Sequence, residues 1–243
     1  MIDYPHHSPS RLNLYCAEPA MFVLEYVLGE RQLVGPPAHR GSAVEDAITH
    51  GLNNAEAPLS ECVAIAMTVY DNKTALSADA RRAKYRDGIP DMVSAALGEL
   101  RAYGKPTSTQ GLIEWKPNGL KFPIIGYYDY RWDNHGVIAD LKTTEKMPSS
   151  IKIPHARQVA LYAASDNVDA RLIYVTPKKI EPYVLENVFA HRNALLRIAQ
   201  TVERFLALSD DPQVLVSLVV PDLDSFYWKD PAMRQRAFEI WGV

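Results

Sequence analysis

The change from a helical to an extended pattern after residue 108 constrains the fold more than any other feature of this chain. Two runs rich in Ile, Tyr and Phe, at 109–115 and 120–132, flank a turn at 116–119 that contains Pro, Asn and Gly. A second short turn leads into a third extended run at 137–142. Turns of this composition join neighbouring antiparallel strands. The sequence therefore predicts a three-stranded meander in the middle of the chain.

The first hundred residues are predicted to be helical, because apolar positions recur at spacings of three and four between Pro and Gly residues. Ser10 is expected to cap a short helix that runs through Cys16, and Pro19 to begin a second helix that Gly29 ends. A third helix is expected to start near Ser42. Further helices are expected at 59–69, 78–86 and 89–103.

The second half of the chain alternates between the two patterns. A helix is expected at 153–164, short strands at 171–175 and 183–187, and a long helix at 190–208. The prediction is a mixed α/β (α+β) fold, in which helices flank a central, partly antiparallel sheet and the N-terminal helices form a layer. A chain of this length and composition is expected to form one domain. Its expected parts are 1–105, mainly helical, 106–190, the sheet core, and 191–243, helical.

Composition limits the classes of partner. The chain has 26 Lys and Arg against 29 Asp and Glu, so its formal charge is −3, and any nucleic-acid binding must depend on a local basic group. Its two cysteines, Cys16 and Cys62, are too few for a four-cysteine metal site and are expected to be buried thiols. A reducing, cytoplasmic location is expected. No run of 18 apolar residues and no signal-peptide pattern occurs, so no membrane association is expected.

Three charged residues of the meander are candidates for chemistry. Asp140 and Lys142 lie two apart on one strand, so their side chains project from the same face. Asp129 lies on the preceding strand, and the turn at 133–136 brings it back beside Asp140. Two adjacent carboxylates repel unless a cation joins them, and their hard oxygen atoms suit Mg²⁺ or Mn²⁺. Lys142 would then lie beside a metal-held water, to help deprotonate it or to offset negative charge.

An Asp and a Lys on one strand face also form ordinary ion pairs, so this pattern alone leaves a structural explanation open. The next predicted helix adds a second observation. Gln158 and Tyr162 are one helical turn apart, so both polar tips lie on one face and can reach the same cleft.

This ordered set of residues resembles the PD-(D/E)XK nuclease superfamily, and specifically its RecB-like, phage-type exonuclease branch. The resemblance depends on Asp129 in Gly-Tyr-Tyr-Asp, Asp140 and Lys142 in Ile-Ala-Asp-Leu-Lys-Thr, and Gln158 with Tyr162. Upstream, the segments 8–12 and 40–45 match the opening of that branch and its first metal-proximal motif. The resemblance covers roughly residues 8–190.

The resemblance implies a restriction-endonuclease-like core and assigns roles to residues. Asp129 and Asp140 would bind the metal, the Leu141 carbonyl would add a ligand, and Lys142 would be catalytic. Gln158 and Tyr162 would contact DNA or orient the site.

Two departures from the family pattern matter. Many relatives have His where this chain has Glu45, which makes a third acidic metal ligand plausible. Some relatives also hold an iron–sulfur cluster with four cysteines, of which this chain lacks three, so no cluster is expected. The cofactor expected is Mg²⁺, with Mn²⁺ as an alternative.

The function implied is metal-dependent exonuclease activity on DNA, serving phage-type recombination or repair and leaving 5′-phosphate ends. Lys146, Lys152 and Arg157 flank the proposed site and are the expected phosphate contacts. Most aromatic side chains at 127–132 are expected in the core, with one left to stack on a frayed base.

Two rivals remain open: a structure-specific endonuclease with the same catalytic residues, and a DNA-binding module that does not cut. A recombinase or single-strand annealing partner and a homo-oligomer also stay open, in the cytoplasm of a bacterial or phage-infected cell.

Overall fold

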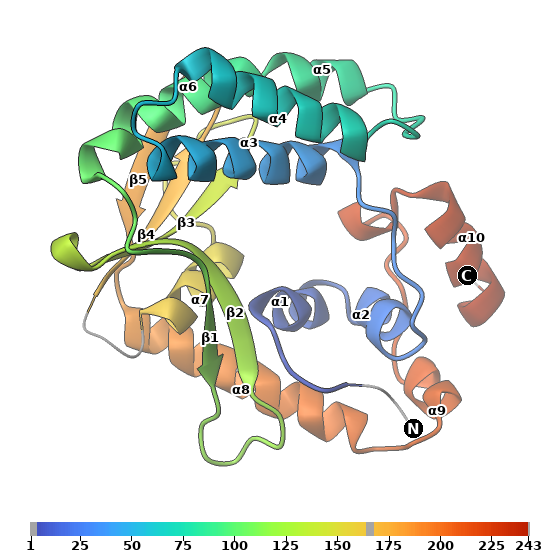
Figure 1. Cartoon of the computed structure of the whole chain (residues 1–243). Helices are drawn as coiled ribbons and strands as arrows, with labels where there is room; N and C mark the ends of the chain where they lie inside the picture. The colour runs from blue at the N-terminus through green and yellow to red at the C-terminus, as the bar shows by residue number, and fades with distance from the viewer. Residues whose placement is uncertain (1–3, 164–167, 243) are drawn as a thin grey trace. The chain divides into compact units, whose positions relative to one another are not determined.

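The computed structural model describes residues 4–163 and 168–242 (Figure 1). The chain divides into two compact units. The first comprises Val34–Ile113 and Tyr127–Val188 and is called the sheet unit below. The second comprises Met1–Leu33, Glu114–Gly126 and Phe189–Val243 and is called the terminal unit.

A five-stranded mixed sheet is the centre of the fold, as the sequence predicted. Its strands lie in the order β1-β2-β3-β4-β5. β2 and β3 are antiparallel, β3 and β4 are parallel, and β4 and β5 are antiparallel. Their bounds are β1 (Ser108–Trp115), β2 (Ile124–Trp132), β3 (Val137–Thr143), β4 (Asp169–Val175) and β5 (Ile180–Val184).

Helices cover both faces of the sheet within the sheet unit. On one face lie α3 (Pro36–Asn53), α4 (Leu59–Lys73), α5 (Arg82–Asp87), α6 (Ile89–Leu100) and the short η1 (Arg101–Tyr103) (Figure 1). On the other face α7 (Ile153–Tyr162) packs against β3 and β4. This arrangement confirms the predicted fold class, an α/β fold with a flanked mixed sheet and an N-terminal helical layer.

Alternation along β3 divides its side chains between these two layers. Val137, Ala139 and Leu141 lie in the apolar core with the residues of α3, α4 and α6. Asp140 and Lys142 therefore project from the opposite face, on the side of α7.

The two ladders that flank β3 differ in length, and this difference positions the site. The parallel ladder with β4 runs the whole length of β3, from Val137↔Asp169 to Thr143↔Val175. The antiparallel ladder with β2 follows the turn η2 (Asp133–His135), begins at Trp132↔Val137 and ends at Tyr130↔Ala139. β2 and β3 are therefore unpaired at the next position, which Asp129 and Asp140 occupy.

Several predicted boundaries were wrong, each for a local physical reason. α3 begins at Pro36 rather than near Ser42, because proline is favoured in the first turn of a helix, where its missing N–H costs nothing. Ser8, not Ser10, caps α1, and its hydroxyl accepts from the Arg11 N–H at 3.3 Å. The last strand is Ile180–Val184 rather than 183–187, because Pro182 is tolerated in an edge strand.

Other elements shift by a few residues. α5 covers Arg82–Asp87 instead of 78–86, and α7 ends at Tyr162, while the predicted end at Ala164 lies outside the described residues.

Cys62 is a buried thiol as predicted, but Cys16 is exposed, so that part of the prediction was wrong.

The terminal unit has a small core of its own. Its helices are α1 (Pro9–Ala17), α2 (Pro19–Tyr26), α8 (Val188–Leu206, which begins at the last residue of the sheet unit), α9 (Pro212–Ser217), η3 (Phe226–Trp228) and α10 (Pro231–Trp241). Met21 and Leu24 of α2 pack with Trp228 and Ala237. Buried His7 lies between the Tyr4 hydroxyl and the Glu203 carboxylate, each at 3.0 Å. None of the helices in the described part of the chain is long and apolar enough to span a membrane.

Candidate active site

Asp129 lies where the β2–β3 ladder ends. Its carboxylate takes the place of a strand partner, because the Leu141 N–H donates to Asp129 Oδ2 at 2.7 Å. The side chain is 7% exposed, so this hydrogen bond satisfies a group that has almost no access to water. The opening between the strands is therefore stabilised by the carboxylate itself.

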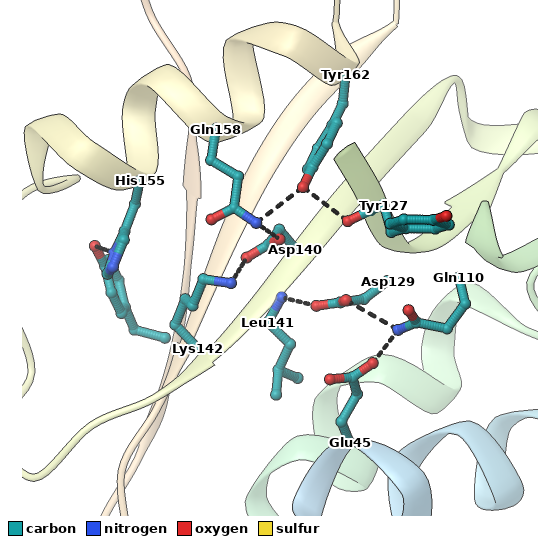
Figure 2. A network of polar contacts seen from close by, with 11 residues as sticks. Glu45, Gln110, Tyr127, Asp129, Asp140, Leu141, Lys142, His155, Gln158 and Tyr162 are labelled. Carbon is teal, nitrogen blue, oxygen red and sulfur yellow. Dashed lines mark hydrogen bonds and ion pairs between the residues drawn. The ribbon is translucent and has the colours of Figure 1, made fainter. Parts of the chain in front are cut away.

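Asp140 is the most deeply buried charged residue of the group, at 1% exposure. Gln158 on α7 donates from Nε2 to Asp140 Oδ1 at 2.8 Å (Figure 2). The Lys142 ammonium forms an ion pair with Asp140 Oδ2 at 2.6 Å. Lys142 itself is 29% exposed, so this charged group extends from a buried carboxylate to the surface.

Tyr162 connects α7 to the end of the β2–β3 ladder. Its hydroxyl donates to the Tyr127 carbonyl at 2.7 Å and accepts from Gln158 Nε2 at 2.8 Å. Gln158 and Tyr162 are one helical turn apart, as the sequence predicted, and both point toward Asp140 (Figure 2). The Tyr162 hydroxyl therefore fixes the orientation of the Gln158 amide, which contacts Asp140.

Glu45 approaches Asp129 from α3, on the opposite face of the sheet from α7. The two carboxylates are joined by Gln110 of β1, whose Nε2 donates to Glu45 Oε1 and, at 3.1 Å, to Asp129 Oδ1 (Figure 2). These side chains and those of Asp140, Lys142, Gln158 and Tyr162 are called the polar group below. The polar group extends from α7 on one side of the sheet to α3 on the other, at the position where β2 and β3 are unpaired.

Burial raises the pKa values of the three carboxyl groups, and repulsion between carboxylates adds to it for Asp129 and Glu45. For Asp129 the main cause is burial, and the charges of Asp140 and Glu45 raise its pKa further. Burial also raises the pKa of Glu45 and of Asp140, although the Lys142 ammonium lowers both. Burial would lower the pKa of Lys142, but the carboxylates of Asp140 and Asp129 outweigh it, so the net direction is upward. Lys142 is therefore held in its charged form.

The structure places the other predicted residues around this group. Lys146 and Lys152 are exposed on the segment that leads from β3 to α7, and Arg157 is partly buried on α7. Leu141 contacts Asp129 through its N–H, while the ligand role of its carbonyl stays a prediction. In the aromatic run Tyr127 is 52% exposed. Its neighbours Tyr128, Tyr130 and Trp132 are buried.

Gln110 is the residue of this group that the sequence analysis missed. Its backbone is left-handed, with φ of 52°, which periodicity does not reveal. The available signal was Gly111, since a glycine inside a strand indicates close approach of another group. A Cβ at Gly111 would overlap the Tyr128 ring.

The donors fit a hard divalent cation in their chemistry. Asp140 Oδ2 is buried beside the Lys142 ammonium, and Asp129 and Glu45 add carboxylate oxygens of the kind that Mg²⁺ and Mn²⁺ prefer. As arranged, no three acidic, His or Cys side chains among the described residues are gathered closely enough to hold a metal ion. Amide and ammonium groups instead contact the carboxylates.

These pKa directions predict the pH dependence of the metal-free protein. A carboxyl whose pKa is raised on folding binds more protons when folded, so stability falls as pH rises from about 4, its unfolded pKa, toward its folded pKa. Asp129→Asn removes this pH-dependent penalty, although its single acceptor oxygen can serve only one of the two donors, Leu141 N–H and Gln110 Nε2. Its thermal midpoint relative to that of native protein should therefore rise as pH increases from about 4 toward 8.

Thermal unfolding between pH 4 and pH 8 with a chelator present measures this difference. Asp91→Asn, at an exposed position of α6, is the matched control. A difference between the Asp129→Asn and native midpoints that stays constant or falls from pH 4 to pH 8 would contradict the pKa directions.

Comparison with known proteins identifies the family. A family model described as the PD-(D/E)XK nuclease superfamily matches residues 6–216. No curated protein matches the chain. Among solved structures, the crystal structure of SSO0001 is 17% identical, with a TM-score of 0.33, and the match covers 71% of this chain and 87% of that one. Since the family model spans most of the sequence, including every residue of the polar group above, the chain belongs to the PD-(D/E)XK nuclease superfamily.

Proposed function

We propose that this protein is a Mg²⁺-dependent exonuclease that hydrolyses phosphodiester bonds in DNA. Membership of the superfamily supports a nuclease, and with it DNA as the substrate. The observation that carries the proposal of metal-dependent hydrolysis is the placement of Asp140, while exonuclease action is implied by the resemblance to the RecB-like branch. Asp140 is almost fully buried, yet it lies between the Lys142 ammonium and the Gln158 amide at the opening of the β2–β3 ladder.

The proposed metal ligands are Asp129, Asp140, Glu45 and the Leu141 carbonyl. Superfamily members generally use divalent metals such as Mg²⁺, and Mn²⁺ would suit the same oxygen donors. When bound, such an ion would polarise the phosphate and lower the pKa of a coordinated water. The chain's own contribution is to hold carboxylates from β2, β3 and α3 around one opening.

Lys142 is the proposed catalytic cation. The upward direction of its pKa supports an ammonium at neutral pH, which orients the attacking water and offsets negative charge on the phosphate. Its partial exposure, 29%, supports access to DNA from the surface.

Gln158 and Tyr162 are proposed as positioning residues. Gln158 keeps Asp140 Oδ1 occupied, so the second oxygen, Oδ2, is the one directed toward Lys142. Tyr162 fixes the amide through its hydroxyl and ties α7 to the Tyr127 carbonyl. Their spacing also supports the RecB-like branch of the superfamily.

Lys146, Lys152 and Arg157 are proposed to contact DNA phosphates. The net charge of −3 offers no general attraction to DNA, so a local group beside the site has to supply it. The exposed Tyr127 ring, on the strand that carries Asp129, is proposed to stack on the terminal base.

The proposed setting is phage-type recombination or repair in a bacterial or phage-infected cytoplasm, with the whole chain acting as one nuclease domain. A structure-specific endonuclease would use the same residues, and a non-cutting DNA-binding module would keep the same fold. These rivals make different predictions for the substrates below.

Digestion of end-labelled linear duplex DNA with Mg²⁺ tests the proposal. Linear DNA should be degraded to products with 5′-phosphate ends, while a covalently closed circle of the same sequence stays intact. Cleavage of the circle would favour the endonuclease. Failure to cut linear, single-stranded and circular DNA with either Mg²⁺ or Mn²⁺ would favour the binding module.

A further inference from the structure

Gln110 has an unusual backbone for its residue type. It lies on β1, is exposed and has φ of 52°, in the left-handed region. Residues with a side chain avoid this region, because Cβ approaches the following carbonyl oxygen. Strained backbone of this kind persists where surrounding contacts compensate for it, and it gathers at functional sites.

The compensating contacts come from two carboxylates. One amide nitrogen, Gln110 Nε2, donates to Glu45 Oε1 of α3 and to Asp129 Oδ1 of β2 (Figure 2). An amide NH₂ group carries two donors, so it can serve one oxygen of each carboxylate at once. The amide therefore reduces the repulsion between two acidic groups that burial has already made costly.

We propose that the Gln110 amide is a placeholder for the metal ion, holding Glu45 and Asp129 together when no cation is bound and competing with the cation for their oxygens. The inference rests on the proposed metal-dependent function and adds a residue to it. Gln110 would be a positioning residue, because it acts through the two carboxylates.

The competition follows from the donor chemistry. Gln110 Nε2 lies between Glu45 Oε1 and Asp129 Oδ1, because it contacts both. A divalent ion with these two oxygens as ligands would occupy the same position between them, so it would displace the amide. Gln110 is exposed, so its side chain can turn away into solvent as the ion enters. Part of the metal-binding free energy is then spent on breaking these hydrogen bonds.

Four proteins test the idea by calorimetric titration of Mn²⁺ without DNA. Gln110→Ala removes the amide and keeps the strained backbone, whereas Gln110→Gly removes both. We expect each to bind Mn²⁺ about tenfold more tightly than native protein, the size expected from losing hydrogen bonds to a charged group. Gln235→Ala is the matched control, because Gln235 is also exposed and donates to a carboxylate, that of Glu239.

Thermal unfolding separates the placeholder role from a purely structural one. Without metal, Gln110→Ala should unfold several degrees below native protein, and saturating Mn²⁺ should remove most of that difference. Gln110→Gly should unfold above Gln110→Ala, because glycine tolerates positive φ. The two variants should nevertheless share one Mn²⁺ affinity.

Three results would overturn the inference. Weaker Mn²⁺ binding by both variants would make the amide a supporting group or ligand instead of a competitor. An unchanged affinity, equal to that of Gln235→Ala, would make its contacts incidental. Absence of Mn²⁺ binding by native protein would remove the proposed metal site as well, so failure of the function is distinguishable from failure of the Gln110 inference alone.

Discussion

Lys142→Met is expected to lower the rate of DNA cleavage by about a hundred- to a thousandfold, the usual cost of losing one charge-stabilising donor from an active site. Methionine keeps most of the side-chain length and removes the ammonium that lies 2.6 Å from Asp140 Oδ2. Because Asp129, Asp140 and Glu45 remain, Mn²⁺ should still bind. The substitution therefore separates the proposed role of Lys142 from that of the proposed metal ligands.

Single-turnover cleavage of linear DNA gives the rate, and calorimetry gives the Mn²⁺ affinity of the same preparation. Lys73→Met, at an exposed position of α4, controls for loss of a positive charge. If Lys142→Met cut DNA at the native rate, Lys142 would be only the structural partner of Asp140.

Asp140→Asn is expected to weaken Mn²⁺ binding by about a thousandfold, as removing one member of a buried charged pair does, and to abolish cleavage. Asn keeps the shape of the side chain, and its carbonyl oxygen can still accept from Gln158 Nε2. The variant should therefore fold. Loss of metal binding and loss of activity should occur together, unlike in Lys142→Met.

Calorimetry with Mn²⁺ and cleavage of linear DNA measure both effects, and circular dichroism checks that the variant is folded. Asp91→Asn again serves as the control. Native-like Mn²⁺ affinity in folded Asp140→Asn would remove Asp140 from the ligand set and, with it, the main support for the proposed mechanism.

The parts of the site that follow from short-range pattern were predictable from the sequence. The alternation of β3 placed Asp140 and Lys142 on one face, and helical spacing placed Gln158 with Tyr162. A hairpin turn of the predicted length placed Asp129 opposite Asp140. Each prediction depends on geometry that repeats every two or every 3.6 residues.

The parts that depend on tertiary contact were not predictable. Gln110 contacts Asp129 from a backbone with positive φ, a conformation that short-range pattern does not predict. The exposure of Cys16 depends on how α1 is packed, and hydrophobicity alone suggested burial. The start of α3 at Pro36 was missed because a proline pair also fits a loop.

The unequal ladders of β3 have a consequence for how this chain can vary. Its full-length pairing with β4 and its apolar face, with Val137, Ala139 and Leu141, leave the strand a single register. If the pairing of β3 shifted by one residue, Asp140 would point into the apolar core on the side of α3, and Leu141 would face α7. Packing alone therefore excludes insertions within β3, whatever the roles of Asp140 and Lys142. The turn η2 lies outside the paired residues of β2 and β3, so the length of this turn can change without moving Asp129 or Asp140.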